Sequence, residues 1–245
     1  MLKNKQHQWG RLHYLAVIAV IGMAALIALI YASRPGNGQD KKQQGISVAD
    51  ILGNADTKGY ARALEPKDFS FPTDHGPHPD YKHEWWYYTG NLETDAGRHF
   101  GFQLTFFRFS LKPHAIERES QWAATQMMMA HLAVSDIDKK KFYHFEKTGR
   151  VALDLTGGVA QPFRVWVDDW SVTGQQGDAW PMRLRATQGD IEIDVELVPA
   201  KPVILQGERG LSRKNSEPGN ASYYYSYSHL KTQGRIRIGA DDHTV

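Results

Sequence analysis

The sequence predicts a mainly β protein, an antiparallel barrel or sandwich, preceded by an N-terminal transmembrane helix. From His83 onward, about ten short segments rich in aromatic and β-branched residues are separated by turn formers at intervals of roughly 8–15 residues. Near the N-terminus, one apolar run is long enough to span a bilayer. Neither an alternation of strands and helices nor a phosphate-binding loop nor a nucleophile elbow is visible, which disfavours nucleotide-binding and α/β-hydrolase folds.

The membrane prediction rests on Tyr14–Ala32, YLAVIAVIGMAALIALIYA. As a helix this run would be about 28 Å long, close to the ~30 Å of bilayer hydrocarbon. Lys3, Lys5 and Arg11 precede it, so the positive-inside rule keeps the N-terminus in the cytoplasm. A cleaved signal peptide is the alternative, but the end of the run fits a small-residue cleavage site poorly. We expect a single-pass inner-membrane protein whose bulk lies in the periplasm.

Composition excludes several classes of function. The net charge is +2, and residues 1–33 alone carry +3, which leaves the rest of the chain at −1. Such a nearly neutral domain is not expected to bind nucleic acid. The chain has no cysteine, which excludes disulfides, thiol nucleophiles and cysteine-based zinc sites. We expect no cofactor.

The chain divides into an anchor (1–33), a linker with short helical turns (34–70), a β domain (71–205), and a loop with a hairpin (206–245). Turn residues and alternating hydrophobicity bound the predicted strands. Thr94–Gly97 is the expected turn of a hairpin, and Ile191–Leu197 shows the cleanest alternation of apolar and acidic residues. These strands are Glu84–Glu93, Arg98–Ser110, Met127–Ile137, Phe142–Lys147, Arg164–Val167, Ser171–Thr173, Met182–Ala186, Ile191–Leu197, Tyr223–Leu230 and Gly234–Ile238.

The most unusual stretch is Phe71–Gly90, FPTDHGPHPDYKHEWWYYTG. Its three prolines exclude a helix. We therefore expect Phe71–Lys82 to be a rigid, irregular segment, which we call the lead-in, that runs into the first long strand. The stretch holds six acidic or imidazole groups directly before an aromatic block, more than solubility requires. We therefore expect the lead-in to pack across the mouth of the β domain, with these side chains turned toward the aromatic strands.

The ionisable groups of this stretch allow several interpretations. His75, His78 and His83 should each find an acid, a backbone carbonyl or a ligand if they are buried. A loop-based metal site is a weaker alternative, and we predict no metal. Arg108 falls on the same strand face as four apolar residues. It either turns outward at a bulge or is buried against a carboxylate such as Glu84 or Asp74.

Four motifs carry a resemblance to a known family. They are FPTDHGPHPDYKHEWWYYTGNL, FGFQLTFFRFSL, HLAVSD at 131–136, and GLSRKNSEPGNASYYYSYSHL at 210–230. This pattern resembles the AttH/CrtC family, a lipocalin-like group that includes carotenoid 1,2-hydratases and predicted secreted hydrolases. The resemblance implies a lipocalin-like barrel. Members of the family usually carry two such domains, so 206–245 would lead toward a second domain that is mostly absent from this sequence.

The resemblance also implies a ligand and a chemistry. Some relatives are associated with ABC export systems, which suggests a lipid or isoprenoid-like ligand and ABC transporter components as partners. Hydration of a double bond needs a carboxylic acid with a raised pKa among aromatic rings, and Asp74 and Glu84 are the candidate acids. The predicted ligand-binding residues are His75, His78, His83, Trp85, Trp86, Tyr88, Arg108, His131, Tyr223 and Tyr225.

Two functions therefore compete at this point, and a third alternative is a purely structural scaffold that docks to a membrane partner. The first is a membrane-anchored periplasmic protein that binds an apolar ligand within its β domain. The second is an enzyme, a hydratase or hydrolase that uses a buried carboxylate among aromatic side chains. A cavity that reaches Asp74 and Glu84 is needed for the second, and an apolar cavity is needed for both.

Overall fold

The computed structural model describes residues 57–113, 120, 123–175, 177 and 179–245. The predicted transmembrane segment Tyr14–Ala32 and most of the predicted linker lie outside this range. Within it, no helix is both long and apolar enough to cross a membrane. Residues 55–245 form one compact unit, to which the following description is confined.

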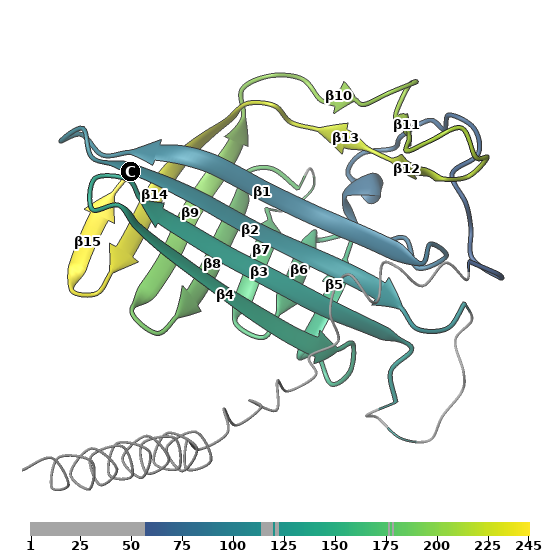
Figure 1. The fold of residues 1–245 in the computed structure, drawn as a ribbon, viewed down its shortest axis with the longest axis horizontal. Helices are drawn as coiled ribbons and strands as arrows, with labels where there is room; N and C mark the ends of the chain where they lie inside the picture. The colour runs from purple at the N-terminus through teal and green to yellow at the C-terminus, as the bar shows by residue number, and fades with distance from the viewer. Residues whose placement is uncertain (1–56, 114–119, 121–122, 176, 178) are drawn as a thin grey trace, which may run out of the picture. The chain divides into compact units, whose positions relative to one another are not determined.

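Two antiparallel sheets face each other in this unit (Figure 1). The first has the order β1-β2-β3-β4 and consists of β1 (His83–Glu93), β2 (His99–Ser110), β3 (Gln126–Asp136) and β4 (Lys141–Arg150). The second has the order β15-β14-β9-β8-β7-β6-β5. Its strands are β5 (Thr156–Val159), β6 (Arg164–Val167), β7 (Trp170–Gly174), β8 (Met182–Gln188), β9 (Ile191–Pro199), β14 (Leu230–Ile238) and β15 (Asp241–Thr244).

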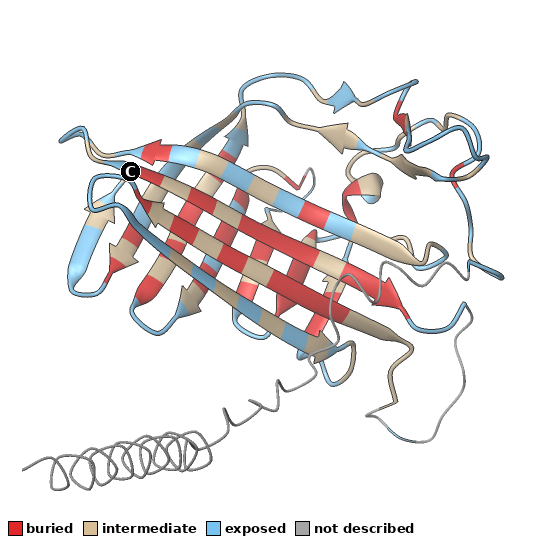
Figure 2. Ribbon diagram, viewed as in Figure 1, coloured by how far each residue is buried: buried red, intermediate tan, exposed pale blue. Residues whose placement is uncertain are grey.

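The core lies between the two sheets, because alternate side chains of each strand point to the other sheet (Figure 2). On β2 the predicted apolar face is confirmed, since Phe100, Phe102, Leu104 and Phe106 are all buried. The clean alternation predicted for β9 is confirmed as well, and Ile193 is fully buried. Trp170 is the largest fully buried side chain, and its indole donates to the carbonyl of Thr187 (2.8 Å).

The hairpin of β1 and β2 sets the geometry of the site. Its turn lies at Thr94–Gly97, as predicted, and Gly97 adopts a left-handed conformation with φ +76° that suits glycine. The pairing then runs without a bulge from Glu93 to His83. This uninterrupted register places Glu84 directly opposite Arg108.

Two details of the predicted fold are corrected. The two large sheets are not joined to each other among the described strands, and no closed barrel is found, because β1 and β4 each lack a second partner strand. The predicted hairpin of Tyr223–Leu230 with Gly234–Ile238 is wrong. Instead, β14 pairs with β9 along its whole length and with β15 at its end, so residues 230–244 complete the seven-stranded sheet.

Residues 204–228 form a segment that we call the strap. It contains four short strands in two pairs, β10 (Ile204–Leu205) with β13 (Tyr225–Ser226), and β11 (Leu211–Arg213) with β12 (Ala221–Tyr223). The strap is hydrogen-bonded to neither large sheet through its strands, and it runs past the free edge of β1 (Figure 1). A cavity, described below, lies between the strap and β1.

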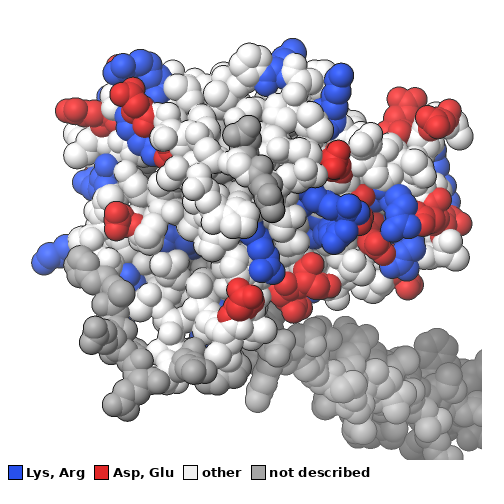
Figure 3. All heavy atoms as spheres, turned by 180° about the vertical axis from the view of Figure 1, so that it is seen from behind, with Lys and Arg blue, Asp and Glu red and all other residues white. Residues whose placement is uncertain are grey.

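The face seen from behind carries Lys and Arg side chains interspersed with Asp and Glu (Figure 3). Ion pairs join neighbouring strands of the seven-stranded sheet, such as Arg183 with Asp194 and Arg237 with Glu192. The arginine side chains of these pairs are exposed, so the pairs contribute little to stability. The charged groups with structural consequences lie instead beside β1.

Candidate functional site

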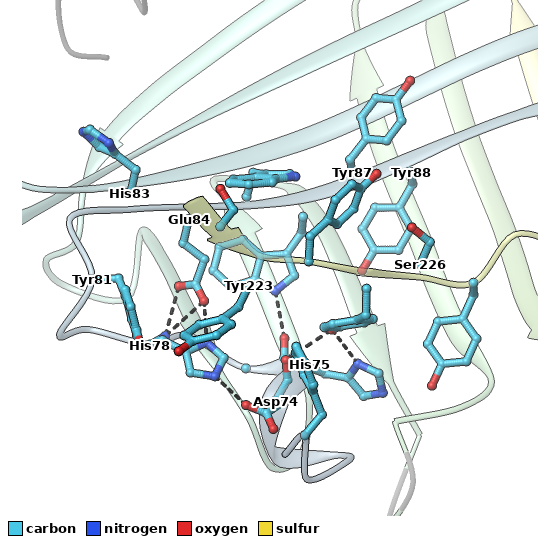
Figure 4. Close-up of a pocket in the computed structure, with 18 of the residues that line it drawn as sticks. Asp74, His75, His78, Tyr81, His83, Glu84, Tyr87, Tyr88, Tyr223 and Ser226 are labelled. Carbon is cyan, nitrogen blue, oxygen red and sulfur yellow. Dashed lines mark hydrogen bonds and ion pairs between the residues drawn. The ribbon is translucent and has the colours of Figure 1, made fainter. Parts of the chain in front are cut away.

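A cavity of about 450 Å³ lies between the lead-in, β1 and the strap (Figure 4). Its walls are mostly aromatic, and its ionisable groups come from the lead-in and the start of β1. The main lining residues are Lys67, Phe69, Asp74, His75, His78, Tyr81, Glu84, Trp85, Trp86, Tyr87, Tyr88, Trp180, Met182, Tyr223, Tyr225 and Tyr227. The size is within the range of small-molecule sites.

His75 is the buried anchor of the lead-in. It ends a short 3₁₀ turn, Thr73–His75, and is 3% exposed. Trp86 donates its indole hydrogen to the His75 carbonyl (2.8 Å). The hydroxyl of Tyr225 donates to the Asp74 carbonyl (3.2 Å), which leaves its oxygen to accept from Nδ1–H of His75 (2.9 Å). The turn is thus fixed between β1 and the strap.

His78 links the two candidate acids. Its Nδ1 lies 2.6 Å from Oε1 of Glu84, and its Nε2 lies 2.9 Å from Oδ1 of Asp74. Lys67 donates to the same oxygen of Asp74 (2.6 Å). Both carboxylates are mostly buried, and the imidazole between them is partly open to the cavity. The result is a chain of hydrogen bonds in which one proton can be shared by three side chains.

Arg108 holds this chain in place from the sheet. Its side chain is almost fully buried, and Nε donates to Oε2 of Glu84 (2.9 Å). Its Nη2 donates to the carbonyls of His78 (2.8 Å) and Tyr81 (2.8 Å). The predicted alternative of a buried guanidinium facing a carboxylate is therefore confirmed. The bulge that would have turned Arg108 outward is absent from the β1–β2 register.

Aromatic rings surround His75 on several sides. Phe71 lies 4.7 Å from the imidazole and 4.8 Å from Tyr225, between ring centres. Trp180 packs edge-to-face against Tyr227 at 4.8 Å. Rings in this arrangement favour apolar ligand surface and, where charge develops, a cation.

The pKa shifts divide the site into a neutral part and a charged part. Burial lowers the pKa of His75 to about 4 despite the nearby charge of Asp74, so this imidazole is neutral at pH 7. The hydrogen bond to Glu84 raises the pKa of His78 against the effect of burial. Burial opposes ionisation of Asp74, but hydrogen bonds from Lys67, Ser70 and His78 outweigh it and lower its pKa. Burial also raises the pKa of Tyr88 and of Tyr225.

Ten of the twelve residues predicted for the site line the cavity. Arg108 lies behind the cavity and acts on it through Glu84. The structure does not bring His131 there, since its ring contacts Phe107 and its Nε2 lies 3.1 Å from Glu146. The ten predicted residues that do line the cavity are Asp74, His75, His78, His83, Glu84, Trp85, Trp86, Tyr88, Tyr223 and Tyr225.

His83 differs from the other two histidines of the motif. We expected every buried imidazole to find a polar partner, but its Nε2 atom is buried with none among the described residues. The ring packs against Phe109 instead (5.7 Å). Across the described part of the chain, no group of three or more His, Asp or Glu side chains is arranged to hold a metal ion.

Sequence reasoning missed several lining residues. Lys67 and Phe69 lie in the stretch assigned to the linker, although the aromatic residue so close to the motif was a usable signal. Trp180 and Met182 come from β8 and its approach, far along the chain. No local pattern distinguishes them from ordinary core residues, because only the packing of the second sheet brings them to the cavity.

The fold and site define an antiparallel β-sandwich protein with an aromatic cavity at one sheet edge. A family model described as AttH-like matches residues 62–245, and the chain belongs to this family. A search of curated proteins finds no match.

Two solved structures are similar. The crystal structure of a protein described as an AttH from Nitrosomonas europaea is 37% identical, with a TM-score of 0.64, over 75% of this chain and 54% of that one. Kievitone hydratase from Nectria haematococca shares the fold, with 10% identity and a TM-score of 0.53, over 76% of this chain and 51% of that one. This chain thus spans about half the length of the structures it matches.

Arg108→Met is expected to lower the free energy of unfolding by about 3–5 kcal/mol, because it leaves Glu84 and two carbonyls without their buried donor. Arg183→Met removes an exposed arginine that is also paired to a carboxylate, and we expect a loss below about 1 kcal/mol. Urea denaturation of both variants measures the difference. Equal losses would show that Arg108 does not hold the lead-in.

His75 should make stability pH-dependent. Its pKa in the folded state is below the value of about 6.5 expected in the unfolded chain, so its stabilising contribution is complete above pH 6.5 and is lost as pH falls toward 4. Between pH 6.5 and 4.5, wild type should lose about 1 kcal/mol per pH unit more than His75→Asn. Denaturation curves at several pH values test this, and parallel pH profiles would contradict it.

Proposed function

We propose that this protein binds a mainly apolar small molecule of lipid or isoprenoid type in the cavity beside β1. The observation that carries the proposal is a cavity of about 450 Å³ whose walls are dominated by Trp, Tyr and Phe. The ionisable groups Asp74, His78 and Glu84 are joined by hydrogen bonds in one cluster, and serine and tyrosine hydroxyls lie elsewhere in the lining. Such a site suits an elongated ligand with an apolar body and a polar end.

The state of the ionisable groups favours binding over acid chemistry at neutral pH. Both ring nitrogens of His78 are engaged by carboxylates, so this imidazole has no free N–H for a ligand. Asp74 is held ionised by its three donors. Both oxygens of Glu84 accept hydrogen bonds from the backbone N–H of His78 and from Arg108 or the His78 ring. A good proton donor is therefore not presented to the cavity in this arrangement.

The proposal also includes the cellular location of this binding site. The apolar run Tyr14–Ala32 would anchor the domain in the inner membrane with the cavity in the periplasm. A binding domain held there could exchange an apolar molecule with the bilayer and with components of an ABC transporter. The support for this setting is the run of apolar sequence and the basic residues before it.

Ligand binding can be tested with the fluorescent probe N-phenyl-1-naphthylamine and with farnesol as competitor. We expect saturable binding of the probe, displacement by farnesol, and a roughly tenfold weaker affinity for Tyr88→Ala, which removes an aromatic ring from the cavity wall. Phe142→Ala removes an equally large ring that is 64% exposed on β4, and it should leave affinity unchanged. Absence of saturable binding, or equal effects of the two variants, would defeat the proposal.

A second candidate function is acid-catalysed hydration of an isolated double bond. The hydrogen-bonded chain Asp74–His78–Glu84 at the cavity favours it, and kievitone hydratase shares the fold. To act as the acid, one of the two carboxylates would have to give up its present donors and take up a proton from this chain. The carboxyl would protonate one alkene carbon, water would add to the resulting tertiary carbocation, and the bound water would return a proton to the carboxylate. Aromatic rings would stabilise the cation.

Hydration has a direct readout. Incubation with an isoprenoid alkene in ¹⁸O-labelled water should yield an alcohol that carries the label, and turnover should fall at least about 100-fold when Asp74→Asn and Glu84→Gln are combined. His131→Gln, outside the cavity, is the matched control. Label incorporation that survives the double substitution would exclude these carboxyls as the acid, and no incorporation at all would leave binding as the function.

A further inference from the structure

We propose that the free edge of β1 is a docking site for an extended segment of another polypeptide, which adds to the four-stranded sheet as a further strand. This inference goes beyond ligand binding, because its basis is the backbone of β1 rather than the side chains of the cavity. The two occupants share the same space, so each is expected to displace the other.

The cavity runs along an edge of β1, not over one of its faces. Every residue from His83 to Thr89 lines it. Neighbouring residues of a strand point to opposite faces, so a space that touches all seven must follow the strand edge. That edge has no partner, because β1 is the terminal strand of the sheet. Residues 221–228 of the strap line the opposite wall.

The hydrogen bonds at the two ends of β1 show which backbone groups are free. Ser110 N donates to Lys82 O, and Thr94 N donates to Arg98 O. With the uninterrupted register between them, the even-numbered residues of β1 exchange hydrogen bonds with β2. The odd-numbered residues then direct N–H and C=O toward the free edge, with no backbone partner in the described part of the chain. Those that line the cavity are His83, Trp85, Tyr87 and Thr89.

β1 itself has few of the features that usually prevent pairing, and the strap flanks its edge without pairing to it through its strands. β1 is 11 residues long and contains no Pro, Lys or Arg, and no bulge interrupts it. Natural sheets commonly protect long edges with such residues or with bulges. Along the edge, partial positive amide hydrogens alternate with partial negative carbonyl oxygens, and the matching alternation is that of another strand. Trp85 and Tyr87, 37% and 51% exposed, flank it on the outer side.

The space between the β1 edge and residues 221–228 of the strap, which we call the slot, suits a single extended segment. The β1 edge of a second copy would be flanked by its own strap, so two β1 edges cannot pair with each other. An inserted strand would place alternate side chains toward the inner wall with Trp86 and Tyr88, and toward the outer wall with Trp85 and Tyr87. The partner is therefore a segment with apolar or aromatic residues at alternate positions.

The test uses nine-residue peptides displayed on phage, random except for apolar residues at alternate positions, selected against the full chain in nanodiscs. The tightest peptide is then synthesised and scanned by N-methylation, which removes one amide hydrogen at a time. We expect affinity losses of roughly tenfold with a period of two residues, as main-chain pairing requires. Failure to select any peptide, or a scan without that period, overturns the proposal.

A protein variant tests the same edge. Tyr87→Pro removes an edge-facing N–H without touching the pairing to β2, whereas Tyr87→Thr removes the same ring and keeps that N–H. Peptide affinity should be roughly tenfold lower for Pro than for Thr, with both variants folded by circular dichroism. Equal affinities overturn the proposal, and so does self-association of wild type that Tyr87→Pro abolishes, since the edge would then serve a second copy.

The same preparations separate this inference from the proposed function. Saturable farnesol binding without peptide binding defeats strand addition and leaves the binding function intact. Peptide binding without farnesol binding does the reverse. Binding of both with mutual displacement is the outcome expected from a shared slot.

Discussion

One buried cation organises the region on which function depends. Arg108 projects from a sheet face that is otherwise apolar. A carboxylate and two backbone carbonyls offset the desolvation of Nε and Nη2, while Nη1 is buried without a partner among the described residues. Those acceptors belong to the lead-in and to the start of β1. The single guanidinium of Arg108 therefore joins β2, β1 and the lead-in. The lead-in has almost no regular secondary structure of its own, so its position depends on this anchor and on hydrogen bonds such as those from Trp86 to the His75 carbonyl and from Tyr225 to the Asp74 carbonyl.

Above this anchor, the site separates charge from apolar space. Lys67, Asp74, His78 and Glu84 balance one another at one end, while His75 remains neutral among rings. The separation follows from the order of the motif, in which acids and imidazoles precede the aromatic block. A polar cluster that is satisfied internally does not need a charged ligand, which agrees with an apolar occupant.

The sequence was sufficient for those parts of the fold that depend on local alternation. The faces of β2 and β9 and the β1–β2 turn follow from period and turn chemistry alone. Pairing between distant segments was not predictable in this way. Tyr223–Leu230 looks like a strand that should pair with the next one, but β14 gains more by covering the edge of β9, and the tyrosines before it are left to form a wall of the cavity.

The unpaired edge of β1 explains why a cavity exists. Had the chain closed into a barrel, β1 would have a partner on its second side and its odd-numbered amides would be satisfied. In the described structure the strap runs past this edge and is held off it by Tyr225, whose ring packs against the lead-in and whose hydroxyl bonds to it. The aromatic space and the unpaired backbone are therefore two consequences of one open edge, and an occupant of either kind must displace water from both.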